Sequence, residues 1–164
     1  MKHAIELIKE LFDSEEWKYD YDEDDKVFVT GINMNSVLGS LRIHIFMQET
    51  SYLVYASLQA TAEEKCYSKI SEYLHRANYG LRNGNFEFNY GSGEIRYKIF
   101  VDFENRELSK DVVARSIFMP IFMFDRYGRG LIKLMLNEGN PEELIEDAEK
   151  DHPEEEERTE SSSQ

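Results

Sequence analysis

The chain has 164 residues, of which 41% are hydrophobic and 13% aromatic, and its formal net charge is −14. This length predicts one domain, whose core relies on Phe and Tyr as well as on aliphatic side chains. Residues 142–164 hold eleven acidic and two basic residues, which leaves 22 acidic and 17 basic residues in the rest. Because no basic stripe is present to contact phosphates, we expect no nucleic-acid binding.

The sequence favours a cytoplasmic protein without a membrane segment. A single cysteine, Cys66, excludes an internal disulfide and is compatible with a reducing compartment. The first twelve residues are amphipathic and mixed in charge, unlike the apolar centre of a signal peptide. The longest apolar run lies within residues 117–124, contains Pro120 and is too short to cross a bilayer.

The first part of the chain predicts one helix and four strands. Apolar residues at helical spacing indicate a helix from about residue 2 to residue 13. Alternating apolar residues then predict four strands, and Val27 and Val29 share a face of the second. These strands cover residues 17–21, 26–32, 41–47 and 52–58.

The middle of the chain predicts a helix followed by a β-hairpin. Thr61 and Glu64 have the spacing of a capping box, which starts the helix at Thr61, and Gly80 is a candidate left-handed stop. Period-two patterning with glycines between predicts two antiparallel strands, each with one buried face. Their buried side chains are expected to be Phe86, Phe88 and Tyr90, then Ile95, Tyr97, Ile99, Val101 and Phe103.

The last part predicts helices. Ser109 is a good N-cap for a helix that Pro120 should kink or divide, and a further helical stretch covers residues 126–137. A short last helix begins at Asn140.

The order α-β-β-β-β-α-β-β-α-α predicts an α+β fold, in which an antiparallel sheet packs against helices. We assign residues 1–150 to this single domain. Residues 151–164 contain no apolar side chain, and we predict that they form a disordered acidic tail.

A set of short motifs in the middle of the chain is typical of one protein family. These motifs are Tyr67, Ile70 and Leu74, then Asn78-Tyr79-Gly80, Gly84-Asn85-Phe86-Glu87, Gly93-Glu94-Ile95-Arg96-Tyr97, Leu108-Ser109, and Tyr127 with Leu131. On these residues the chain resembles the YbjN-type domain family, whose members are similar in fold to type III secretion chaperones. The likeness covers residues 15–137 and is clearest over residues 61–131.

The resemblance implies a type III secretion chaperone-like fold in a bacterial protein. Members of the family are described as regulators of sensory transduction or as chaperone-like proteins. A YbjN-like domain is therefore expected to bind proteins without catalysis, either a separate partner or a second copy in a homodimer. No catalytic residue is carried over, because the shared motifs are glycines, aromatics and helix caps.

The acidic residues near the start of the chain invite a calcium-site interpretation. Asp20, Asp22 and Asp24 begin with the spacing of an EF-hand loop, but Asp25 and Gly31 stand where that loop needs glycine and a bidentate glutamate. We therefore interpret the cluster as a solvated turn. No metal and no cofactor is predicted.

The histidines and the cysteine also have simple interpretations. None of the histidines has the paired spacing of a zinc site, so all are expected at the surface; they are His3, His44, His75 and His152. Cys66 falls on the apolar stripe of its helix and is expected to be a buried, unreactive thiol.

Residues 117–124 give the clearest signal for binding, because they are apolar on every side and a surface helix needs only one apolar face. Two explanations stay open: this segment is central to the core, or its second face contacts a partner. Apolar side chains also stand on the polar faces of two strands, and exposed apolar patches mark interfaces. The expected partner contacts are Phe46, Phe100, Phe118, Met119 and Phe122.

Three functions stay open. The first is a chaperone-like or regulatory module that binds a partner's apolar segment or self-associates, with no small-molecule substrate indicated. The second is an enzyme whose carboxylates meet only in the fold, which a deep pocket with shifted pKa values would indicate. The third is a nucleic-acid mimic, or a partner of basic proteins that uses the acidic tail. The first is favoured, because the motifs serve packing rather than chemistry.

Overall fold

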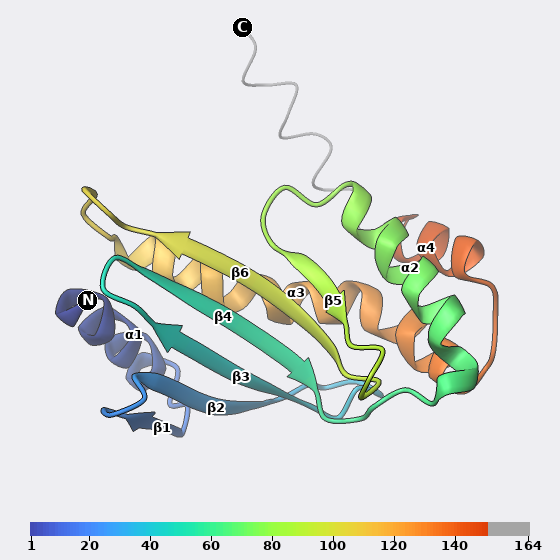
Figure 1. Ribbon diagram of the computed structural model, residues 1–164, viewed down its shortest axis with the longest axis horizontal. Helices are drawn as coiled ribbons and strands as arrows, with labels where there is room; N and C mark the ends of the chain where they lie inside the picture. The colour runs from blue at the N-terminus through green and yellow to red at the C-terminus, as the bar shows by residue number, and fades with distance from the viewer. Residues whose placement is uncertain (151–164) are drawn as a thin grey trace, which may run out of the picture.

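One antiparallel sheet with helices on a single face makes up the computed structural model, which describes residues 1–150 (Figure 1). The predicted α+β class and element order are confirmed. The helices are α1 (Lys2–Ser14), α2 (Tyr67–Tyr79), α3 (Lys110–Met135) and α4 (Pro141–Lys150), with a 3₁₀ turn, η1 (Glu64–Cys66), before α2. The strands are β1 (Tyr19–Asp22), β2 (Val27–Asn33), β3 (Ser40–Met47), β4 (Ser51–Leu58), β5 (Asn85–Phe88) and β6 (Ile95–Asp102). The predicted tail, residues 151–164, lies outside the described residues.

The six strands lie in the order β1-β2-β3-β4-β6-β5, and every neighbouring pair is antiparallel. β6 pairs with β4 although α2 and β5 separate them in the chain, so β5 becomes an edge strand. The two edge strands, β1 and β5, have four residues each. Short edges present few unpaired backbone groups to other chains, so the two edges of the sheet offer little backbone for pairing.

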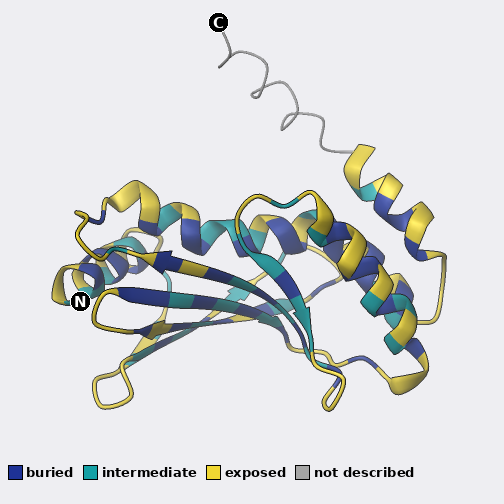
Figure 2. Cartoon of the chain, turned by 45° about the horizontal axis from the view of Figure 1, so that its top comes forward, coloured by how far each residue is buried: buried dark blue, intermediate teal, exposed yellow. Residues whose placement is uncertain are grey.

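The helices bury one face of this sheet (Figure 2). α3 contacts β4 and β6, α1 packs against α3, and α2 and α4 pack against each other and against α3. As predicted, the core is rich in aromatic side chains. Its largest fully buried members are Tyr52, Tyr73, Tyr97, Phe12, Phe28 and Phe124.

The β5–β6 hairpin is confirmed, and motif residues hold it in place. Asn78, near the end of α2, accepts a hydrogen bond from the Phe86 amide at 2.7 Å and donates one to the Phe86 carbonyl at 3.0 Å. Gly93 has φ +73°, and a Cβ there would lie 2.3 Å from the Ala62 carbonyl oxygen, so a side chain is excluded. The expected burial of Tyr90 is wrong: this residue follows β5 and is 61% exposed.

The start and stop predicted for the second helix are also wrong. The chain enters a 3₁₀ turn at Glu64 and the α-helix only at Tyr67, and no side chain caps either element. The Ala62 amide instead donates to the Gly93 carbonyl at 2.9 Å, which holds the segment against the β5–β6 turn. Gly80 has φ −96°, an ordinary right-handed value. A contact outside the helix therefore decides where it starts, and its end has no left-handed glycine.

α3 continues through Pro120 as one helix of 26 residues, so the proline does not divide it. Ser109 is its N-cap as predicted, and its hydroxyl accepts from the Val112 amide at 3.3 Å. Proline lacks one backbone donor, and Pro120 is buried among the core-facing residues of α3. Among residues 1–150, no helix combines the length and apolar character that a membrane crossing requires.

β2 presents its two valines to the face opposite the core. Phe28 and Thr30 are the buried residues of this strand, whereas Val27 and Val29 are half-buried on the other side. Phe28 packs on Phe12 of α1, with ring centroids 5.9 Å apart. The larger aromatic ring therefore occupies the core, and the valines contribute to the opposite surface.

Candidate functional site

The sheet face opposite the helices is the candidate functional site. All helices of residues 1–150 lie on the other side of the sheet (Figure 2). The outward side chains of the strands therefore form a continuous surface, which we term the open face. Along each strand these side chains alternate with core residues, and the strand register aligns them in rows across the sheet.

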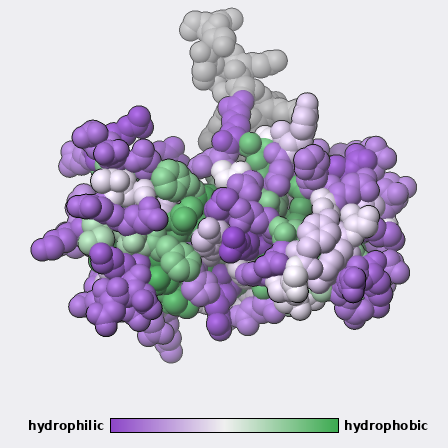
Figure 3. All heavy atoms as spheres, in the orientation of Figure 1, coloured by the Kyte–Doolittle hydropathy of each residue, from purple (hydrophilic) through white to green (hydrophobic). Residues whose placement is uncertain are grey.

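One of these rows is apolar. Val27, Phe46, Leu53 and Phe100 are successive register partners on β2, β3, β4 and β6. Phe46 is 40% exposed and Phe100 is 57% exposed, whereas Val27 and Leu53 are half-buried. Figure 3 views the open face and shows hydrophobic side chains gathered over β3, β4 and β6. We term these four residues the apolar row.

The neighbouring row combines aromatic and charged groups. It runs from Asp20 on β1 through Val29, His44 and Tyr55 to Lys98 on β6. We term these five residues the mixed row. Its β1 end is acidic, its centre is aromatic and its β6 end is basic.

Neighbouring side chains orient the cations of β6. The Arg96 guanidinium lies 4.1 Å from the centroid of the Tyr55 ring, in a cation–π arrangement. Glu87 on β5 pairs with Arg96 at 2.8 Å and also with Lys98. Burial raises the pKa of Glu87, but hydrogen bonds from Lys98 and Arg96 and the two positive charges outweigh it, so the pKa is lowered. Glu87 is therefore ionised at neutral pH and holds both cations in place.

His44 adds aromatic surface rather than charge. Burial and the nearby Arg42 lower the pKa of His44, and Glu94 opposes this shift. The ordinary histidine pKa is about 6.5, so the imidazole is neutral at pH 7. It stacks beside Phe46, with ring centroids 6.1 Å apart and planes inclined by 22°. The aromatic centre of the mixed row thus extends the apolar row.

The predicted partner contacts fall on two separate surfaces. Phe46 and Phe100 lie together on the open face, in the same row. Phe118, Met119 and Phe122 lie on α3, in the helical layer on the other side of the sheet.

The apolar segment of α3 belongs largely to the core. Ile117 and Phe124 are fully buried, and Phe118 packs on Trp17 with ring centroids 5.5 Å apart. Met119 is half-buried, and Phe122 is 59% exposed. The core therefore takes most of the side chains of this segment, and contact with a partner through the exposed Phe122 stays a prediction.

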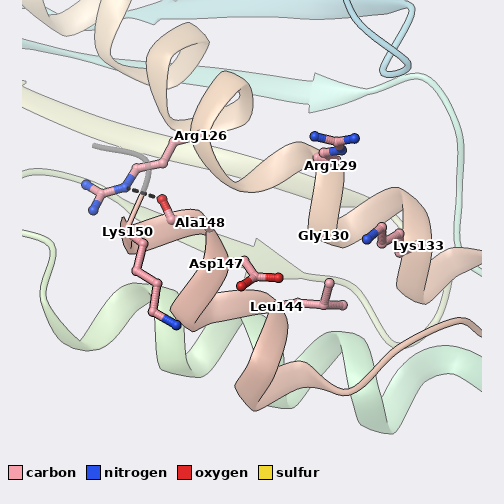
Figure 4. A pocket seen from close by; sticks show the side chains of 8 residues that line it. All are labelled: Arg126, Arg129, Gly130, Lys133, Leu144, Asp147, Ala148 and Lys150. Carbon is pink, nitrogen blue, oxygen red and sulfur yellow. Dashed lines mark hydrogen bonds between the residues drawn. The ribbon is translucent and has the colours of Figure 1, made fainter. Parts of the chain in front are cut away.

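A cavity of about 400 Å³ lies between α3 and α4. In Figure 4 the Asp147 carboxylate of α4 lies between the two helices, and the Lys150 side chain points away from α3. The Arg126 Nε donates to the Ala148 carbonyl at 3.4 Å. Lys133 contributes a further cation, so the lining is mainly basic, with one carboxylate.

A second hollow, of about 620 Å³, lies beside the β5–β6 turn. Its lining includes Glu87, Glu94 and Arg96, so it adjoins the basic end of the open face. Glu94 accepts a hydrogen bond from the Ser57 hydroxyl at 2.9 Å. The lowered pKa of Glu87 is that of a group held ionised in an ion pair, not that of a general acid poised near neutral pH.

The acidic turn and Cys66, which the sequence singled out, both make local contacts in the structure. Asp22 accepts hydrogen bonds from the Asp24 and Asp25 amides, both at 2.9 Å, and thereby closes the β1–β2 turn. Within residues 1–150, no group of three His, Cys, Asp or Glu residues is arranged to hold a metal ion. Cys66 is buried as predicted, with its Sγ 3.6 Å from the Met135 carbonyl.

The histidine predictions are confirmed at two positions. His3 and His75 are exposed, whereas His44 is half-buried on the open face. His152 lies outside the described residues.

Two members of the apolar row, Val27 and Leu53, escaped the sequence-based prediction. A signal for Leu53 is present: Tyr52, Leu53, Val54 and Tyr55 form an unbroken apolar run. A strand that is apolar in both phases is apolar on both faces. For Val27 the sequence does not show which sheet face the side chain occupies, since the next two residues, Phe28 and Val29, are apolar as well.

A scan against protein-family models gave no match, and a search of curated proteins found no similar sequence. The resemblance to YbjN-type domains therefore rests on the motifs quoted above and stays a prediction.

Proposed function

We propose that this chain is a non-enzymatic, cytoplasmic protein-interaction module, chaperone-like or regulatory, that binds an apolar protein segment on the open face of its sheet. The bound segment belongs to a separate protein or to a second copy of the chain. The single observation that carries the proposal is the apolar row. It crosses four adjacent strands, and no helix of residues 1–150 covers it.

The chemistry around the apolar row supports this role. Contiguous exposed apolar groups with a polar border are typical of protein-binding surfaces. Tyr, Phe and Arg are enriched at the centres of such surfaces, and here Phe46, Tyr55 and Arg96 are neighbours on adjacent strands. The resemblance to YbjN-type domains agrees with a binding role.

The α3 surface has weaker support as a docking site. Among its predicted contacts, Phe118 already packs on Trp17, and only Phe122 is mostly exposed. Arg115 lies between Val112 and Met119 on the outer side of this helix and is itself exposed. The two cavities offer charged linings without a set of groups in catalytic roles, and neither favours an enzyme.

A capture experiment with matched variants tests the proposal. The wild-type chain, a Phe46→Ser/Phe100→Ser variant and a Phe122→Ser variant serve as bait in extracts of the native cell. Captured proteins are cross-linked, and the cross-links are mapped by mass spectrometry. Phe100 and Phe122 are 57% and 59% exposed, so these two substitutions remove comparable side chains, and the open-face variant loses Phe46 in addition.

We expect one protein, either a different chain or this chain itself, to be captured by the wild type and by the Phe122→Ser variant. The open-face variant should lose it, and its cross-links should map to β3, β4 and β6. Loss on Phe122→Ser alone would move the site to α3. Equal capture by all three baits would contradict binding on the open face.

A further inference from the structure

The mixed row carries opposite charges at its two ends. Asp20 stands on β1 and Lys98 on β6, four strand steps apart, which is about 19 Å at the usual strand spacing. Asp22, also on β1, adds a second carboxylate on the acidic side. Arg96 and Lys98 form the basic side, with Glu87 between them and the sheet edge.

Such a face is complementary to a copy of itself. Consider a two-fold axis that runs parallel to the strands, between two facing sheets and midway between β3 and β4. This rotation reverses the strand order and keeps each row opposite its own copy. The apolar row then lies against the apolar row, with β2 opposite β6 of the partner subunit. Asp20 on β1 lies opposite β5 of the partner subunit, one strand spacing of about 4.8 Å from Lys98 of the partner subunit, which the long lysine side chain can span. An axis perpendicular to the strands would instead place the acidic strand β1 on itself.

We infer that the occupant of the open face is a second copy of this chain, in a two-fold, face-to-face dimer. This inference rests on the proposed function, because it names what binds the same surface. Facing sheets pack with their strands about 30° apart, and side chains as long as lysine and arginine accommodate that rotation. Paired opposite charges at both margins fix the register, while the apolar rows exclude water at the centre.

The size of the open face fits a reversible dimer. Six strands of up to eight residues give a footprint on the order of 600 Å² per copy. Stable interfaces of standard size bury about 800 Å² per partner. The open face lies below this size, so we expect an association that dissociates readily. At 0.15 M salt the Debye length is about 8 Å, which screens the long-range repulsion between two acidic copies while close pairs persist.

A charge-swap experiment on the full chain tests the inference. Asp20→Lys brings like charges together on diagonally neighbouring strands, next to Lys98 of the partner subunit, and Lys98→Glu does the same next to Asp20 of the partner subunit. Each variant alone should raise the dimer dissociation constant by about tenfold or more. An equimolar mixture of the two should restore the dimer, because both contacts across the axis again join opposite charges. Sedimentation velocity over a concentration series measures the dimer fraction.

Three controls separate the interface from other effects. Glu138→Lys changes the net charge as much as Asp20→Lys does, at an exposed position between α3 and α4, and should leave the dimer intact. Lys98→Gln removes the ion pair with Glu87 without reversing the charge, and should weaken the dimer less than Lys98→Glu. Circular dichroism and thermal melting establish that each variant is folded.

A monomeric wild type, or a mixture of folded variants that stays monomeric, would overturn the inference. So would a dimer that survives both single substitutions. These results are distinct from failure of the proposed function. If the wild type is monomeric but the Phe46→Ser/Phe100→Ser bait still loses a different captured protein, the open face binds that protein and the dimer alone is rejected.

Discussion

At the scale of single residues, a buried series of hydrogen bonds links Tyr52 of β4 to Ser116 of α3. The Tyr52 and Ser116 hydroxyls lie 2.8 Å apart, and the Ser116 hydroxyl donates to the Val113 carbonyl at 2.8 Å. Since the serine proton is used in this way, the Tyr52 hydroxyl is the donor to Ser116. Burial raises the pKa of Tyr52 to about 12, although the bond to Ser116 opposes the shift. The phenol therefore stays protonated throughout the neutral range.

Removing the Tyr52 hydroxyl and removing the Ser116 hydroxyl should lower the stability of the fold by unequal amounts. Tyr52→Phe deletes the donor, and Ser116 keeps its bond to Val113, so we expect a loss of about 1 kcal/mol in the free energy of unfolding. Ser116→Ala leaves the buried Tyr52 hydroxyl without its acceptor, and we expect a loss of about 2 kcal/mol. Urea denaturation measures both. Ser68→Ala, at an exposed position, is the control. If Tyr52→Phe cost as much stability as Ser116→Ala, or more, then Tyr52 would not be the donor to Ser116.

At the scale of secondary-structure elements, the close contact between α2 and α3 depends on Gly130, which has no side chain. Tyr73 of α2 is fully buried, and its hydroxyl donates to the Tyr127 carbonyl of α3 at 2.8 Å. A Cβ at Gly130 would lie 2.4 Å from the Tyr73 hydroxyl oxygen and 2.7 Å from its Cζ. Both the ring and its hydroxyl are held, so the two helices would have to separate to admit a methyl group.

Gly130→Ala should therefore destabilise the fold even though alanine favours helices. The helical preference of alanine is worth about 1 kcal/mol over glycine, while overpacking a core costs roughly 1–3 kcal/mol. We expect a net loss of about 1 kcal/mol and a lower melting temperature. Gly80→Ala is the matched control, because nothing lies within 4 Å of a Cβ there. A Gly130→Ala protein more stable than wild type would mean that α2 and α3 adjust without strain.

At the scale of the whole molecule, apolar and charged residues are distributed unevenly along the sequence. Residues 151–164 hold six of the 33 acidic residues, one basic residue and no apolar side chain. Such a segment has no hydrophobic surface to bury against the core. The apolar residues of the chain thus all lie within residues 1–150.

A chain ending at residue 150 should accordingly unfold like the full chain. We expect free energies of unfolding within about 0.5 kcal/mol of each other, and equal slopes against urea concentration, since the slope follows the surface exposed on unfolding. Chemical denaturation monitored by Trp17 fluorescence measures both quantities. A loss above 1 kcal/mol on truncation, or a smaller slope, would assign residues 151–164 a part in the folded domain.

Local patterns in the sequence were sufficient for the elements and the fold class. Period-two alternation located the strands and the β5–β6 hairpin, and helical spacing located α1, α2 and α3. The caps at Ser109 and Asn140 were also predictable, because a cap forms with amides two or three residues away. These features depend on neighbours in the chain, so the sequence by itself determined them.

Only the tertiary structure decided which surfaces the elements present. The Ala62–Gly93 hydrogen bond replaced the cap expected at Thr61, and α3 stayed continuous at Pro120. The strand register brought Phe46 and Phe100 into one row, while the helical layer carried Phe122 to the other side of the sheet. The physical reason is that hydrogen bonds and packing between residues far apart in the chain leave no periodic trace in the sequence.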